Sequence, residues 1–161
     1  MKSLLILLFV FASVSQKELN EIRLSFKEAS SNETSATNFY NMVQSIDDNS
    51  PLVLAYDGAG EVIYSKFLDS KADKLSHFKT GTSRLEEAIE IDSDDIEIRF
   101  IRLVIQEQTP GFLGYNDNID DDVSFIMDNF VRSSENVKTM ILDYIDSSDN
   151  FTPEQKNELK N

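Results

Sequence analysis

Residues 95–108, DIEIRFIRLVIQEQ, decide the fold of this chain. This stretch is rich in Ile, Phe, Leu and Val and has few polar residues, so that a helix formed by it carries apolar side chains around almost its whole circumference. A helix that is apolar nearly all round is buried inside a domain rather than lying on its surface. We therefore expect the other elements to pack around this helix.

Apolar residues recur at helical spacing along the rest of the chain as well. In residues 17–30, for example, Leu19, Ile22, Phe26 and Ala29 follow one another at intervals of three and four. No stretch shows the period-two alternation of a strand, so we predict an all-α array of about seven or eight helices in hairpins, without a sheet. The other expected helices are 34–47, 51–68, 70–91, 119–131, 135–146 and 153–160.

Glycines interrupt two of the expected helices: Gly58 and Gly60 lie in 51–68, and Gly81 lies in 70–91. A glycine inside a helix costs about 1 kcal/mol relative to alanine, so a packing reason is expected. A phosphate-binding loop is excluded, because no strand precedes these glycines and the spacing of such loops is absent. We predict that helices approach one another closely at these small residues.

The stretch LEEAIEIDSDDIEI, residues 85–98, resembles the end of one tetratricopeptide repeat and the start of the next. Ala88 takes the small packing position, Leu85 the bulky position before it, and Asp92 the acidic end of the helix. Ser93 stands where the repeat has a proline, which keeps the cap and loses the rigid turn. No second copy follows at the spacing of the family, and the resemblance is close over residues 85–98 and looser over residues 50–108.

A wider pattern resembles that of small exported helical proteins of Bacteroidota. It runs through AYDGAGEVIYSKF (55–67), KLSHFKTGTSRLEEAI (74–89) and IEIRFIRLVIQEQTPGFLGY (96–115). Together the two resemblances imply an exported domain with a tetratricopeptide-repeat-like core over residues 50–108. They imply no particular chemistry.

Residues 1–15 have the features of a secretory signal peptide. Lys2 gives a positive start, residues 4–12 are an unbroken apolar run, and small residues precede an expected cleavage site before Gln16. The run is too short for a stable membrane anchor, which needs about 20 apolar residues. We expect residues 16–161 to form a single domain in the periplasm or outside the cell, with no membrane insertion after cleavage.

The composition excludes several classes of function. The 161 residues include 29 Asp and Glu against 15 Lys and Arg, and the net charge of -14 disfavours nucleic acid as a partner. The chain has no cysteine and one histidine, so thiolate metal sites, iron–sulfur clusters and cysteine nucleophiles are excluded. We expect no cofactor.

Two arginines on the apolar helix are the strongest candidate for a binding site. Arg99, Arg102 and Gln106 lie at positions i, i+3 and i+7, so they share one face of residues 95–108. Together with Tyr56 they form a candidate site for an anion or a peptide carboxylate, which arginine binds through two parallel hydrogen bonds. The alternative is an internal ion-pair network, because a buried arginine must be paired. The acids considered as its partners are Asp57, Glu61, Glu86 and Glu90.

A weaker metal candidate follows the loop at 109–115. Asn116, Asn118, Asp120 and Asp122 alternate as the oxygen ligands of a calcium loop do, but the glycine and the glutamate of such a loop are absent. Acids at this place also suit the first turn of a helix. The single histidine, His77, has no catalytic motif around it, and we expect it on the surface.

These patterns favour a non-catalytic, exported binding or scaffold module that recognises a peptide or protein partner in the cell envelope. The fold analogy behind this hypothesis is associational. The alternative is a carboxylate-based hydrolase in which an acidic pair acts on a substrate that Arg99 and Arg102 hold. A groove with an open Arg102 favours binding, whereas two carboxyls close together in a deep pocket favour hydrolysis.

Overall fold

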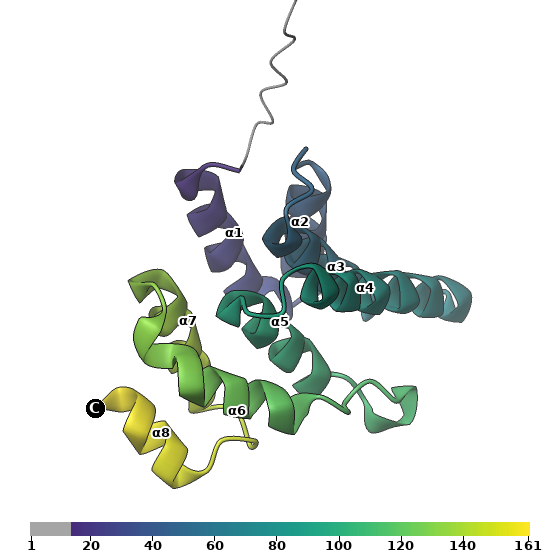
Figure 1. Cartoon of the computed structure of the whole chain (residues 1–161). Helices are drawn as coiled ribbons and strands as arrows, with labels where there is room; N and C mark the ends of the chain where they lie inside the picture. The colour runs from purple at the N-terminus through teal and green to yellow at the C-terminus, as the bar shows by residue number, and fades with distance from the viewer. Residues whose placement is uncertain (1–13) are drawn as a thin grey trace, which may run out of the picture.

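The computed structural model describes residues 14–161 and is all-helical there (Figure 1). Within these residues it has eight α-helices, two short 3-10 helices and no strand, which confirms the predicted all-α array without a sheet. Most of the predicted signal peptide lies outside the described residues. The helices are α1 (Gln16–Ala29), α2 (Glu33–Gln44), α3 (Pro51–Ser65), α4 (Lys71–Ile91), α5 (Ile96–Glu107), η1 (Gly111–Leu113), α6 (Ile119–Asn129), η2 (Phe130–Arg132), α7 (Glu135–Ile145) and α8 (Pro153–Lys160).

Helix α5 lies in the middle of the fold, as its sequence predicts (Figure 1). Ile98, Ile101 and Leu103 have no exposed surface, and the helix packs against α3, α4 and α6. Asp95 caps its first turn by accepting hydrogen bonds from the backbone N–H groups of Glu97 and Ile98. Burial on several sides leaves little room for polar residues on α5, so each of those present needs a partner inside the protein.

Helices α3 and α4 form an antiparallel hairpin whose crossing is made possible by glycine, as predicted. A Cβ atom on Gly81 would lie 2.4 Å from the carbonyl oxygen of Gly58, and a Cβ on Gly58 would lie 2.7 Å from that of Gly81. Both distances are too short for a real contact, so the two backbones touch at this point. Gly60 faces α2 in the same way, with Val43 2.9 Å from its would-be Cβ.

Most helix ends agree with the sequence-based bounds to within two residues, and the two ends that differ by three residues have local causes. Helix α2 ends at Gln44 rather than at residue 47, because the acidic and polar residues before Pro51 form the connection to α3. Helix α3 ends at Ser65 rather than at residue 68, and the Ser65 hydroxyl donates to the carbonyl of Val62 in its last turn. Helix α8 begins with a capping box, in which Gln155 donates its backbone N–H to the side-chain oxygen of Thr152.

The C-terminal helices α6, α7 and α8 complete the fold around α5, beyond the part that packs against α3 and α4. Helix α6 runs antiparallel to α5, α7 lies alongside α1 in the same direction, and α8 packs against α7 (Figure 1). One apolar cluster joins buried residues from all eight α-helices, from Leu19 on α1 to Leu159 on α8. No helix within residues 14–161 has the length and apolar content needed to cross a membrane.

Candidate functional site

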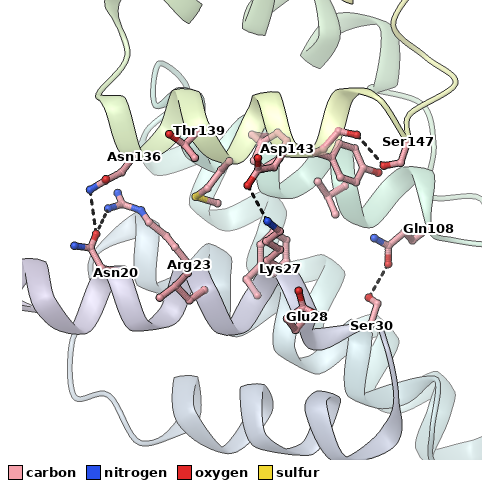
Figure 2. Close-up of a pocket in the computed structure, with 16 residues that line it drawn as sticks. Asn20, Arg23, Lys27, Glu28, Ser30, Gln108, Asn136, Thr139, Asp143 and Ser147 are labelled. Atoms are coloured by element: carbon pink, nitrogen blue, oxygen red, sulfur yellow. Dashed lines mark hydrogen bonds and ion pairs between the residues drawn. The ribbon is translucent and has the colours of Figure 1, made fainter.

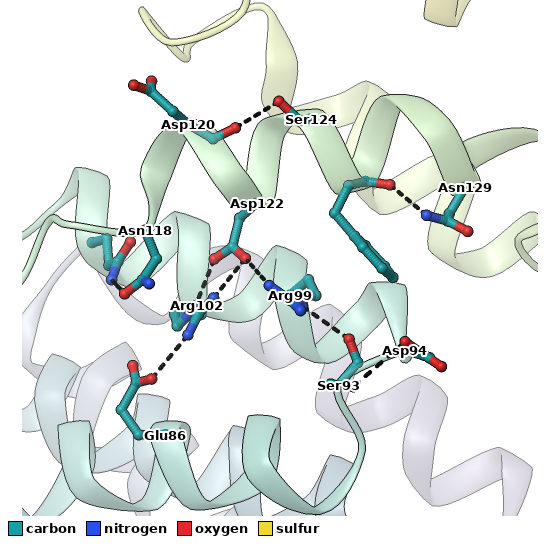
Figure 3. A network of polar contacts seen from close by, with 12 residues as sticks. Glu86, Ser93, Asp94, Arg99, Arg102, Asn118, Asp120, Asp122, Ser124 and Asn129 are labelled. Carbon is teal, nitrogen blue, oxygen red and sulfur yellow. Dashed lines mark hydrogen bonds and ion pairs between the residues drawn. The ribbon is translucent and has the colours of Figure 1, made fainter.

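Arg102 is buried and fully occupied by internal partners. Its side chain makes two parallel hydrogen bonds to Asp122 on α6, from Nε to Oδ2 at 2.8 Å and from Nη2 to Oδ1 at 2.7 Å (Figure 3). Its third donor, Nη1, lies 2.8 Å from Glu86 Oε2 on α4. Burial alone would lower the pKa of Arg102, but the hydrogen bonds and charge of Asp122 raise it, so the guanidinium stays charged.

Arg99 extends the same network toward the surface. Its Nη1 lies 3.1 Å from Asp122 Oδ1, and its Nε donates to the backbone carbonyl of Ser93 at 3.0 Å (Figure 3). The guanidinium also lies over the ring of Phe125, 4.8 Å from its centroid. Asp122 therefore holds both arginines, and its own side chain has no exposed surface.

These contacts form an internal ion-pair network of the kind weighed for the two arginines. Glu86 is one of the acids considered in the sequence, and Tyr115 donates to its other oxygen at 2.6 Å. Asp57 and Glu61 instead pair with Arg84 on α4. The main partner, Asp122, comes from a helix whose position against α5 the sequence does not reveal.

The other candidate residues are also held inside the protein. Tyr56 is fully buried and donates to Glu97 Oε1 at 2.5 Å, and Glu97 takes two hydrogen bonds from Arg23 at 2.6 and 2.7 Å. This group ties α1, α3 and α5 together, and burial together with the charge of Glu97 raises the pKa of Tyr56. Gln106 donates to Asn118 Oδ1 at 3.2 Å.

The calcium candidates do not form a common ligand cage. Asp122 is committed to the two arginines and Asn118 to Gln106, while Asn116 and Asp120 are exposed. In the described part of the chain, no group of three or more His, Cys, Asp or Glu side chains is placed to hold a metal ion. The acids at 120–122 stand in the first turn of α6, where negative charge favours the helix dipole.

His77 is partly buried rather than lying freely on the surface. Its ring Nδ1 pairs with Glu61 at 2.5 Å, and its ring meets those of Tyr40 and Tyr64 edge to face. Sequence spacing gave no sign of this cluster, because Tyr40 comes from α2, Tyr64 and Glu61 from α3, and His77 from α4. Arg84 also binds Glu61, so the carboxylate is held from two sides.

A groove opens between α1 and α7, above a floor formed by α5 (Figure 2). This α1–α7 groove has a volume of about 550 Å³, and apolar atoms make up most of its lining surface. Polar pairs bridge it at the surface: Lys27 with Asp143 at 2.8 Å, and Asn136 with Asn20 at 3.1 Å. Other residues that line the groove are Leu24, Phe26, Phe100, Val104, Gln108, Thr139, Met140 and Tyr144.

A second groove, of about 620 Å³, lies where the start of α4 meets the loop after α5. Its lining is mainly apolar, and three lysines stand around it. We call it the lysine groove and define it by Lys66, Lys71, Lys74, Phe78, Phe112 and Leu113. The sequence predicted neither groove, although the spacing of the lysines at 66–79 is a signal that could have indicated the second.

Comparison with known proteins adds no assignment to these features. A scan against protein-family models and searches of curated proteins and of solved structures found no match to this chain. The tetratricopeptide-repeat-like character of residues 50–108 and the resemblance to exported proteins of Bacteroidota therefore stay predictions.

Proposed function

We propose that this chain is an exported, non-catalytic binding module that holds a peptide segment of a partner protein in the α1–α7 groove. One observation carries the proposal: the groove has an apolar floor and a polar rim between two helices. Phe100 and Val104 form part of the floor and Met140 part of the α7 wall, where they can take up apolar side chains of a peptide.

The rim of the α1–α7 groove suits a peptide backbone. Asn20, Asn136 and Gln108 carry amides, which both donate and accept hydrogen bonds as a peptide bond does. The rim also carries charges of both signs, in Lys27 and Asp143, so it selects for neither an acidic nor a basic ligand. The Lys27–Asp143 pair is about half exposed on each side and contributes little to stability, so a ligand can replace it.

The binding function is favoured over the hydrolase alternative, because the acids around the two arginines are held in ion pairs. Asp122 and Glu86 are engaged with Arg102 through hydrogen bonds of 2.7 and 2.8 Å. A general acid and a nucleophile need at least one carboxyl oxygen open to the substrate. A carboxylate held in ion pairs is a poor candidate for either role.

The test of the peptide site begins with selection of binders from a phage-displayed library of random peptides. Peptides selected on the wild type are then synthesised, and their dissociation constants are measured by fluorescence anisotropy. Thr139 is exposed and lines the groove, so we expect Thr139→Trp to fill the groove and to raise the dissociation constant by about tenfold or more, which corresponds to the loss of ~1.4 kcal/mol.

The matched control is Thr80→Trp, which changes an exposed threonine of α4 that lines neither groove. It is expected to leave peptide affinity unchanged. Selected peptides that bind Thr139→Trp as tightly as the wild type would contradict the proposed site. Failure to enrich any peptide would contradict the proposed function itself.

Export is tested by the mass of the protein recovered from the periplasm of a bacterial host. We expect a chain that begins at Gln16, without residues 1–15. Ser15 caps α1 through a capping box with Glu18, so cleavage there removes the cap. The form that begins at Gln16 is therefore expected to be about 1 kcal/mol less stable to urea than a form that begins at Val14. Recovery of the full-length chain from the cytoplasm would rule out export.

A further inference from the structure

We propose that the lysine groove is a second binding site, separate from the α1–α7 groove, and that it takes a free long-chain carboxylate, a fatty acid. The proposal joins two properties of one place: cations without a carboxylate partner, and an apolar hollow beside them. It goes beyond the peptide-binding function and does not depend on it.

The first property is the state of the three lysines. Within residues 14–161, Lys66, Lys71 and Lys74 form no ion pair, and no aspartate or glutamate lines the groove. Lys66 donates to the side-chain oxygen of Gln108 at 3.1 Å, and Lys74 donates to the backbone carbonyl of Lys66 at 3.2 Å. Both acceptors are neutral. Although the chain has nearly twice as many acids as bases, the three lysines around this groove carry positive charge that no carboxylate of the groove balances.

The surroundings of Lys66 also favour the binding of an anion. Solvent reaches its side chain, yet the walls of the groove are apolar enough that desolvation lowers the pKa of Lys66. No carboxylate offsets this shift. An anion bound beside Lys66 would favour its charged form, so ligand charge and protein charge would stabilise one another.

The second property is the apolar surface of the hollow. Phe112 is 87% exposed and Leu75 is 45% exposed, although both line the groove beside the buried Val62. Phe112 stands on η1, in the loop after α5, and lines the hollow together with residues from the start of α4. Large exposed apolar side chains gathered at one hollow mark a place where an apolar ligand gains free energy by leaving water.

A fatty acid matches both properties at once. Its carboxylate can pair with Lys71 and Lys74 at the start of α4, where the helix dipole also favours an anion. Its alkyl chain can lie against Phe78 and Phe112. The groove volume of about 620 Å³ lies in the range of small-molecule sites. An anionic membrane surface fits less well, because the net charge of -14 repels the whole protein from it.

The experiment measures binding of monomeric palmitate to the purified protein by isothermal titration. Hexadecanol, which has the same alkyl chain without the charge, and acetate, which has the charge without the chain, are the comparison ligands. We expect palmitate to bind and both comparison ligands to bind at least about tenfold more weakly. Hexadecanol lacks the charge that pairs with the lysines, and acetate lacks the alkyl chain that gains free energy by leaving water.

Lys74→Gln and Lys79→Gln form a matched pair of variants. Both remove one lysine charge from α4, but only Lys74 lines the groove. We expect Lys74→Gln to weaken palmitate binding by about tenfold and Lys79→Gln to leave it unchanged. Thr139→Trp, in the other groove, is expected to leave it unchanged as well, so this site and the peptide site can fail separately.

Three outcomes would overturn the proposal. The first is no binding of palmitate, and the second is equal binding of hexadecanol and palmitate. The third is co-sedimentation with phosphatidylglycerol vesicles that Lys74→Gln abolishes while monomeric palmitate stays unbound, which would assign the lysines to a membrane surface. Phe112→Ser provides an independent check. It is expected to weaken palmitate binding, and because Phe112 is exposed, its substitution is expected to leave the fold intact.

Discussion

The Asp122→Asn substitution is expected to lower the free energy of unfolding by about 3 kcal/mol. Asp122 has no exposed surface and accepts hydrogen bonds from Arg102 and Arg99. The asparagine keeps the size of the side chain but removes its charge, so the buried guanidinium of Arg102 keeps only Glu86 to balance it. Removing one partner of a buried ion pair is strongly destabilising, because an uncompensated charge stays behind. Urea denaturation followed by circular dichroism measures the change.

The matched control is Asp120→Asn, two residues earlier in the same first turn of α6. Asp120 is exposed, and its carboxylate forms no ion pair with any residue in the range 14–161. Its loss removes a favourable interaction with the helix dipole and is expected to cost about 1 kcal/mol or less. Equal effects of the two substitutions would show that Asp122 acts as one more helix-terminal acid, and that the buried network does not stabilise the fold.

A second large effect is expected from Gly81→Val, which we expect to lower the free energy of unfolding by about 3 kcal/mol. Besides the carbonyl of Gly58, a Cβ at this position would lie 2.7 Å from Val62 Cγ2 and 2.9 Å from Glu61 Cβ. The backbone oxygen cannot move without parting α3 from α4. Overpacking of this kind costs ~1–3 kcal/mol, and the loss of the hairpin contact places Gly81→Val at the upper end. Thermal and urea unfolding give the measurement.

Gly111→Val is the control for this effect. Gly111 has no atom within 4 Å of a would-be Cβ, and its backbone does not have the positive φ that favours glycine. Its substitution is expected to change stability by about 0.5 kcal/mol or less. If Gly81→Val were as mild as Gly111→Val, the close approach of α3 and α4 could not be a fixed feature of the fold.

Much of the fold could be predicted because the determining signals are local. The spacing of Leu19, Ile22 and Phe26 is enough to assign α1, and the apolar circumference of residues 95–108 is enough to place α5 at the centre. The glycines predicted a close helix crossing, because a glycine in the middle of a helix is destabilising and a close contact between helices offsets that cost. Each of these inferences uses neighbours within one or two turns.

The site could be predicted less well, because its residues come together across the chain. From the sequence, Asp122 was interpreted as an acid of a helix start or as a calcium ligand. In the structure it binds Arg102 and Arg99, which lie 20 and 23 positions earlier in the chain, on α5. The lysine groove likewise combines α4 with Phe112 from a loop, and no periodicity relates the two. Helical spacing tells which face of a helix is apolar, but not which helix lies against it.

The pairing of Arg23 with Glu97 has a consequence for the order in which the chain assembles. These two residues are 74 positions apart, so during synthesis α1 is complete well before its carboxylate partner exists. At ~5–20 residues per second, the ribosome needs about 4–15 s to cover that interval. Until α5 has emerged, Arg23 and Tyr56 do not have the Glu97 carboxylate that binds them both in the folded protein. Helix α1 therefore completes its buried ion pair only after α5 has been made.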